Sequence, residues 1–160
     1  MFEKFGEFNS ADEIKELADN LLNENDFESL NALAKENGIA EDFVEMFMQM
    51  DVPTLCDAET AALGKIDIEV QELKPQEIME DWVEYLRCQV SENTDLARAV
   101  RMKGKSLKGM IGHLLKWSFG HQQSIDKEII KAAGVNAGKV TLGIPGMARV
   151  KKLIKEYYMG

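Results

Sequence analysis

The sequence predicts an all-α fold, or nearly so: a compact domain of about eight helices with at most one short β element. Three observations favour this fold class. Apolar residues recur every three or four positions over most of the chain, which is the spacing of helices that bury one face. Ser, Asp and Asn residues stand where these stretches begin, as helix caps do. The connections between them are short, so neighbouring helices can pack on one another.

The first three helices are predicted from caps and apolar stripes. Ser10–Glu13 reads as a capping box that starts a helix. Asp26 is the expected cap of the second helix, and Gly38 is well placed to end it. The third helix is predicted over residues 39–50. Its expected buried side comprises Phe43, Met46, Phe47 and Met50.

Residues 54–73 are ambiguous between helix and strand. Ala58–Leu63 has helical spacing, whereas Ile66–Val70 alternates like a strand. We favour a helix because no partner strand is evident nearby. Pro75 is then expected at the first position of the next helix, where proline is well tolerated. The apolar side of that helix repeats at Ile78, Trp82, Leu86 and Val90.

The second part of the chain predicts further helices. Asn93 and Thr94 cap a helix over 95–102, and Ser106 begins an amphipathic helix over 106–119. The outer face of this amphipathic helix is cationic, with Gly109 and Gly112 leaving backbone open to close approach. The residues expected to face its core are Leu107, Met110, Ile111, Leu114 and Leu115.

The C-terminal stretch predicts two more helices around a loop. Ser124 is the expected cap of a helix over 125–133, with Asp126 near its positive end. Residues 135–146 are rich in glycine, and Val140–Leu142 is their strand-like part. The last helix is predicted over 147–158, with Lys151, Lys152 and Lys155 facing outward.

Charge divides the chain into two parts. Residues 1–95, the acidic half, hold 25 acidic and 6 basic residues, whereas residues 96–160, the basic half, hold 3 acidic and 13 basic residues. We expect the two helical halves to form one compact domain. Such an asymmetry indicates interaction surfaces, provided that both charged territories stay exposed.

The cellular setting is predicted from what the sequence lacks. Cys56 and Cys88 form no Cys-x-x-Cys pair, and a chain of 160 residues does not need disulfides to be stable. The first residues show no secretion signal, and no stretch reaches the roughly 18 apolar residues of a membrane span. We therefore expect a cytoplasmic protein that does not associate with membranes, and two thiols that are buried and inert.

Two surfaces are candidates for binding. The first is an acidic face that would meet a basic protein or nucleoprotein partner, although such acids often only solvate a helix. The second would bind nucleic acid phosphates, although its cations could equally complement the acidic half. The acidic face comprises Glu77, Glu80, Asp81 and Glu84. The basic set comprises Arg98, Arg101, Lys103, Lys105, Lys108 and Lys116.

No catalytic residue, metal site or cofactor is predicted. His113 and His121 would lie about 12 Å apart on a continuous helix and cannot share one metal ion. The Gly143–Gly146 turn resembles an anion site, but it lacks the phosphate-loop spacing and reads as a turn into a helix. We therefore expect a protein that is not an enzyme.

The methionines near residue 46 leave two interpretations open. Thioether side chains repack easily, so they suit an adaptable binding surface as well as a core. The group comprises Met46, Met48 and Met50, beside Phe43 and Phe47.

Short motifs in the last sixty residues resemble the PcfK-like proteins of conjugative elements and phages of Gram-positive gut bacteria. They are Lys103-Gly-Lys105-Ser-Leu107, Ile125-Asp-Lys-Glu-Ile129 and Lys155-Glu-Tyr-Tyr158, and the opening Phe2-Glu-Lys-Phe-Gly-Glu-Phe8 is similar to the start of such mobile-element proteins. The resemblance implies a non-enzymatic accessory protein that acts by binding. Some relatives of that group are regarded as inhibitors of RNA-guided CRISPR nucleases.

The function predicted from the sequence is therefore that of an interaction protein of a mobile genetic element. Inhibition of a CRISPR nuclease is its narrowest form. The alternative is a nucleic-acid-binding accessory protein that uses the basic half. The sequence leaves the oligomeric state open.

Overall fold

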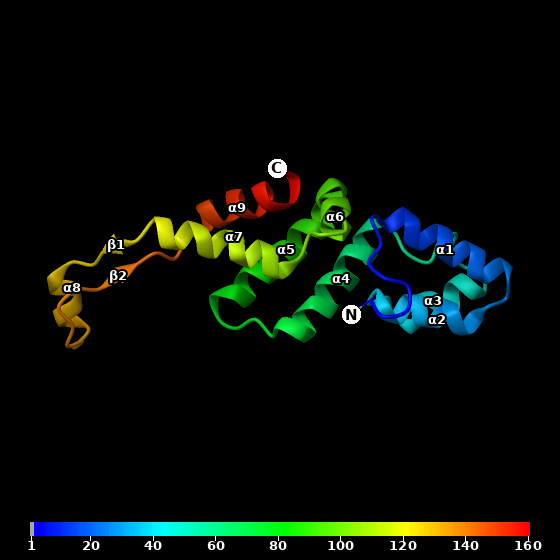
Figure 1. Cartoon of the computed structure of the whole chain (residues 1–160), viewed down its shortest axis with the longest axis horizontal. Helices are drawn as coiled ribbons and strands as arrows, with labels where there is room; N and C mark the ends of the chain where they lie inside the picture. Colours follow the sequence, from blue (N-terminus) through cyan, green and yellow to red (C-terminus); the bar gives the residue numbers. More distant parts are fainter. Residues whose placement is uncertain (1) are drawn as a thin grey trace.

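The computed structural model describes residues 2–160 and confirms a mostly helical fold. Figure 1 shows an elongated arrangement, with α1–α3 at one end and β1, α8 and β2 at the other. The helices are α1 (Ala11–Asn23), α2 (Phe27–Glu36), α3 (Glu41–Met48), α4 (Ala58–Leu73), α5 (Ile78–Glu92), α6 (Thr94–Arg101), α7 (Leu107–Gly120), α8 (Lys127–Ala132) and α9 (Met147–Met159). The strands β1 (Gln123–Ser124) and β2 (Thr141–Leu142) pair antiparallel.

The first three helices form a unit that we call the head, residues 11–51. Its first two helices begin at the predicted caps: Ser10 Oγ accepts a hydrogen bond from the Glu13 amide at 3.3 Å, and Asp26 Oδ1 accepts one from the Ser29 amide at 3.0 Å. The third, α3, begins at Glu41 without a side-chain cap. The core of the head is formed by Ala11, Ile14, Ala18, Leu21, Leu30, Leu33, Ala34, Ile39, Val44 and Phe47. Three residues that follow the head, Leu55, Cys56 and Ala61, also pack in this core.

A second core lies among α4, α5, α6, α7 and α9. Helix α4 joins the two cores, because Ala61 packs in the head whereas Ala62 and Ile66 pack in the second core. Side chains of α5 and of α6 share that second core, including Leu86 and Val100. The change of charge near residue 95 therefore does not coincide with a boundary between cores.

Two glycines let α4 pack against the turn that follows α2. A Cβ atom on Gly64 would lie 2.2 Å from the Asn37 carbonyl oxygen, and one on Gly38 would lie 2.3 Å from the Gly64 carbonyl oxygen. Gly38 also has a φ of +66°, which favours glycine. This backbone contact sets how closely the head approaches α4.

The ambiguous stretch at 54–73 is helical from Ala58 onward. Asp57 is its cap, with Oδ1 accepting from the Thr60 amide at 2.7 Å. The expectation that Pro75 begins the next helix was wrong, because α5 starts at Ile78, after Glu77 with a φ of 54°.

The expected start of α8 was also wrong. Ser124 pairs with Thr141 in the small sheet, so it is not available as a cap. Asp126 caps α8 instead, with its side chain accepting from the Glu128 amide.

Three apolar residues that we expected to be buried are exposed. Helix α3 ends at Met48, so Met50 lies beyond it and is 81% exposed, while Phe43 is 39% exposed. Val44 and Phe47 fill the core in their place. On α7 the core receives Leu107, Met110 and Leu114, whereas Leu115 is exposed.

Residues 121–146 form a projection between α7 and α9 that we call the arm (Figure 1). The arm contains β1, α8 and β2, and most of its side chains are exposed. No helix within residues 2–160 combines the length and apolar character that crossing a membrane requires.

Candidate interaction surfaces

The acidic face lies on the first two turns of α5 and on the residue before it. All four carboxylates of this face are exposed, while Trp82 and Leu86 on the other side of the helix are buried. Among them, Glu84 forms an ion pair with Arg87, with Oε1 3.1 Å from Nε. Carboxylates in the first turn also interact favourably with the positive end of the helix. The face comprises Glu77, Glu80, Asp81 and Glu84.

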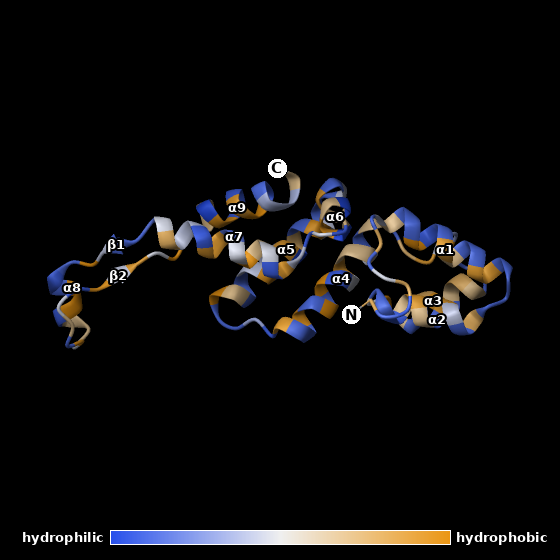
Figure 2. Cartoon of the chain, viewed as in Figure 1, coloured by the Kyte–Doolittle hydropathy of each residue, from blue (hydrophilic) through white to orange (hydrophobic). Residues whose placement is uncertain are grey.

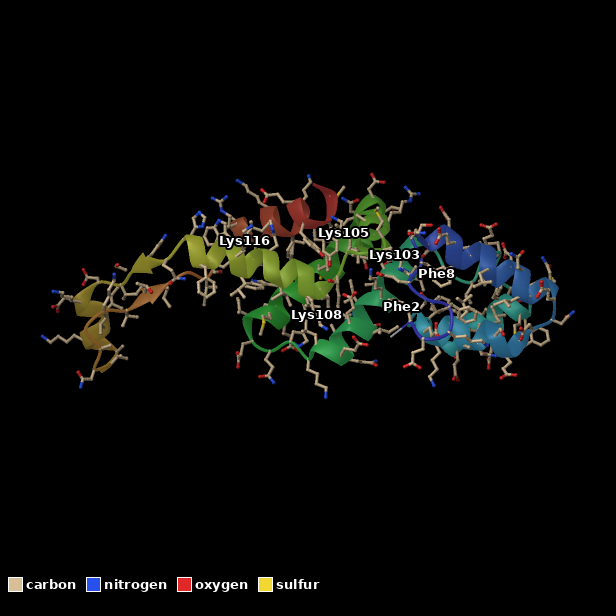
Figure 3. All side chains as sticks on the ribbon, in the orientation of Figure 1. Phe2, Phe8, Lys103, Lys105, Lys108 and Lys116 are labelled. Carbon is tan, nitrogen blue, oxygen red and sulfur yellow. The ribbon has the colours of Figure 1, made fainter. Side chains whose placement is uncertain are left out.

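The six predicted cations do not share one surface. Lys103 and Lys105 lie near the start of α7, and Lys116 lies toward its far end (Figure 3). Arg98 is exposed and pairs with Asp95 at 3.2 Å. The exposed members of the set are Arg98, Lys103, Lys108 and Lys116.

Arg101 does not belong to the surface set, which corrects the prediction from the sequence. Its side chain is 0% exposed. Arg101 Nη2 donates to Asn37 Oδ1 at 2.8 Å and Nη1 donates to the Phe8 carbonyl at 3.3 Å. The rings of Phe2 and Phe8 flank its guanidinium, with centroids 5.7 and 6.0 Å from Cζ. Arg101 cannot reach a phosphate without leaving this position.

Lys105 is half-buried rather than free. Its Nζ donates to the Tyr157 carbonyl at 2.6 Å and lies 5.1 Å from the Tyr157 ring centroid. Both contacts use the ammonium that we expected to face a partner. Lys105 therefore holds α9 against the start of α7.

A buried polar cluster joins the N-terminal segment to α4 and to the connection between α6 and α7. Lys65 is 2% exposed, and its Nζ donates to Glu7 Oε1 at 3.0 Å and to the carbonyls of Met102 and Lys105 at 2.9 and 2.6 Å. One turn later, Glu69 Oε2 accepts from the Leu107 amide at 2.7 Å. Burial lowers the pKa of Lys65 and raises the pKa of Glu69. We missed this cluster in the sequence, where the only signal was a lysine and a glutamate spaced by four in an apolar helix.

Gly109 allows a close contact, as expected, but this contact is with Tyr157 of the same chain and not with a partner. A Cβ atom there would lie 2.0 Å from the Tyr157 hydroxyl oxygen, which accepts from the Ser106 amide at 3.0 Å. No atom lies within 4 Å of the corresponding position at Gly112. Of the two glycines, only Gly112 leaves the outer face of α7 open.

The three outward lysines of α9 line a groove of about 280 Å³. Tyr85 and Gln89 of α5 line the same groove, and Lys151 Nζ lies 5.6 Å from the Tyr85 ring centroid. All three lysines are exposed, so the groove presents positive charge beside an aromatic ring. These lysines are Lys151, Lys152 and Lys155.

The histidines have separate partners. His113 Nε2 lies 3.6 Å from Glu156 Oε2, and His121 stacks on Trp117 with ring centroids 4.1 Å apart. Within residues 2–160, no three His, Cys, Asp or Glu side chains are grouped as metal ligands would be.

The two cysteines differ, which corrects the expectation of two buried thiols. Cys56 is buried, and this burial raises the pKa of its thiol to about 11. Cys88 is exposed.

The ion pairs that residues 2–160 form do not neutralise the acidic half with the basic half. Lys65–Glu7 and Arg87–Asp67 lie within the acidic half. His113–Glu156 lies within the basic half, and Arg98–Asp95 is a pair three residues apart at the border. The acidic face of α5 and the lysines of α9 thus both remain exposed.

No relative accompanies this geometry. The chain matches no family model, none of the curated proteins and none of the solved structures with which it was compared.

Proposed function

We propose that this protein is a non-enzymatic interaction protein that binds a basic protein or nucleoprotein through the acidic face of α5. One observation supports this proposal above the others. Four carboxylates lie exposed within eight residues, and within residues 2–160 Glu77, Glu80 and Asp81 form no ion pair with a cation. Exposed carboxylates that no neighbour neutralises attract a positively charged surface and speed association with it.

Affinity capture from a bacterial lysate tests this proposal. The lysate is treated with nuclease, so that proteins bridged only by nucleic acid are lost. We expect the wild-type chain to retain a basic protein, and a variant with lysine at positions 77, 80, 81 and 84 to lose it. Retention of the same protein by this variant would contradict the proposal.

A matched control separates the position of the charge from the net charge. Four other exposed acids, on or beside α1 and α2, give the same change in net charge when replaced by lysine. We expect this control variant to keep the captured partner, with a slower association because long-range attraction is weaker. The control residues are Glu16, Asp19, Glu24 and Glu28.

The narrowest form of the proposal is that a mobile genetic element uses the protein to inhibit an RNA-guided nuclease. The resemblance to PcfK-like proteins supports this form. Such nucleases hold nucleic acid in positively charged channels, which a carboxylate-rich surface can occupy in place of phosphates. We expect the wild-type chain to slow target cleavage by a susceptible nuclease, and the variant reversed on α5 to leave cleavage unchanged. Equal inhibition by both would rule out the acidic face as the inhibitory surface.

An accessory protein that binds nucleic acid is the second candidate. The groove lined by Lys151, Lys152 and Lys155 supports it, since the lysines are exposed and Tyr85 can contact a base or sugar. We expect a gel shift at low salt that weakens steeply as salt rises, because bound phosphates release counterions. Replacement of these three lysines by glutamate should abolish the shift. The absence of any shift at low salt would exclude this function.

A further inference from the structure

Large apolar side chains are exposed mainly at the two ends of the molecule. In the arm and at its base, Phe119, Ile129 and Ile144 are 75%, 60% and 61% exposed. In the head, Met50 and Phe43 are 81% and 39% exposed. Figure 2 shows apolar residues along β2 and on α8, and α8 lies away from the other helices of the chain. Apolar surface that the chain's own core leaves uncovered is typical of a docking surface.

The arm has little core of its own. Its strands have two residues each, and α8 has six. Ile130 is the buried apolar anchor of α8. A two-stranded hairpin of this size is marginally stable in water, so a second surface that packs on it would stabilise it considerably.

The arm carries a groove of about 330 Å³ with apolar and basic lining residues. Ile130 and Val135 line it, and so do Lys127 and Lys131. The two lysines are four residues apart and therefore lie on the same side of α8. This groove suits an apolar side chain that is flanked by carboxylates.

The head presents a surface of that chemistry. Between α2 and α3 lies a groove of about 450 Å³, whose apolar lining includes Ala34, Ile39 and Val44 and whose charged lining is Lys35 and Glu41. Exposed Phe43 lies on the same short helix as this groove, as do three acids. The three acids are Glu41, Asp42 and Glu45.

Charge favours one mode of pairing among copies of the chain. The head, residues 11–51, holds twelve acidic and two basic residues, whereas the charged residues that line the arm groove are Lys127 and Lys131. Pairing one arm groove with another, or head with head, brings like charges together, which costs free energy. Pairing an arm with a head brings opposite charges together. The two ends of one molecule lie far apart (Figure 1), so the complementary surface must belong to a second copy.

We propose that the arm of one copy docks on the α2–α3 groove of a second copy. The apolar residues of the arm pack against the floor of the head groove and Phe43, and Lys127 and Lys131 face Glu41 and Glu45. This contact is heterologous, so two copies that dock reciprocally form a closed dimer, and copies that dock in succession form larger rings or open chains. The acidic face of α5 lies outside the contact, so each copy in such an assembly displays it.

Sedimentation velocity of the full chain tests the docking without any variant. We expect dimers or larger species whose share grows with protein concentration at about 0.05 M salt. Their share should fall at about 1 M salt, where the screening length is only about 3 Å. A chain that stays monomeric at every concentration would overturn the proposal, and so would an association that does not weaken as the salt concentration rises.

Charge-swapped variants test which surfaces meet. The arm variant carries Lys127→Glu and Lys131→Glu, and the head variant carries Glu41→Lys and Glu45→Lys. Each alone should associate at least about tenfold more weakly than the wild type. A mixture of the two should regain association, because every arm then meets a head of opposite charge. Circular dichroism confirms that both variants are helical.

One control and two contradicting outcomes complete the test of the arm–head contact. Lys103→Glu, at an exposed position between α6 and α7, is a control for the loss of positive charge and should associate as the wild type does. If the head variant alone assembles like the wild type, the arm pairs with another surface and the proposal is wrong. A mixture that stays as monomeric as its two components would contradict it equally.

Discussion

Arg101 Nη2 donates to Asn37 Oδ1 at 2.8 Å across 64 residues of sequence. Arg101 is the last residue of α6, in the second core, and Asn37 directly follows α2 in the head. Both side chains are buried. The bond therefore ties the two cores together at the place where α4 passes from one to the other.

Arg101→Ala should reduce the free energy of unfolding by at least about 2 kcal/mol, because it leaves Oδ1 of buried Asn37 without its donor and removes a charged hydrogen bond. Arg98→Ala, three residues earlier on the exposed side of α6, should change it by less than about 0.5 kcal/mol. Urea unfolding measures both. Equal stability of the two variants would mean that the Arg101 contacts contribute little.

Gly64→Ala should also destabilise the protein, although alanine favours helix more than glycine does. The added Cβ would lie 2.2 Å from the Asn37 carbonyl oxygen, so α4 and the head must move apart. The matched control is Gly112→Ala in α7, where no atom lies within 4 Å of the new Cβ. We expect the control to gain up to about 1 kcal/mol in thermal or urea unfolding. A gain at Gly64 as well would contradict the close packing.

The pH dependence of stability should change with Glu69→Gln. Burial raises the pKa of Glu69 in the folded state, so between its unfolded and folded values the folded state binds more protons than the unfolded state. Stability from this group is thus fully present below the unfolded value, near 4.5, and falls as the pH rises. The variant lacks this loss, so its stability relative to the wild type should improve from about pH 4 upward. A constant difference across unfolding curves at several pH values would rule out the effect.

The two thiols should react at different rates. A thiol reagent modifies the thiolate, which is scarce at Cys56 because burial raises its pKa to about 11. Cys88 is exposed and should react within the first phase. The modified thiols are counted over time in the native and in the urea-unfolded chain. We expect one fast-reacting thiol in the native chain and two in the unfolded chain. Two fast thiols in the native chain would place Cys56 near the surface.

Local signals were sufficient to predict most helices. The caps at Ser10, Asp26, Asn93 and Ser106 act within three residues of themselves, so the sequence alone reveals them. Ser124 failed as a cap because a residue seventeen positions away pairs with it. Local sequence does not reveal which distant segments pair.

The binding surfaces were harder to predict because exposure depends on distant partners. Arg101 and Lys105 look like solvated cations, yet Asn37 and Tyr157 bind them. The acids of α5 are exposed as predicted, since the apolar side of an amphipathic helix determines its wet side. Periodicity could not show that the apolar residues of the arm stay uncovered, because it reports spacing and not what packs on it.

The most direct test of the proposed function is the association rate constant with the captured basic partner, measured over a series of salt concentrations. If carboxylates on α5 draw that partner in, the wild-type rate should fall steeply as salt screens the attraction, and the variant with lysine at positions 77, 80, 81 and 84 should associate far more slowly at low salt. A rate that is the same for both chains and independent of salt would contradict the account.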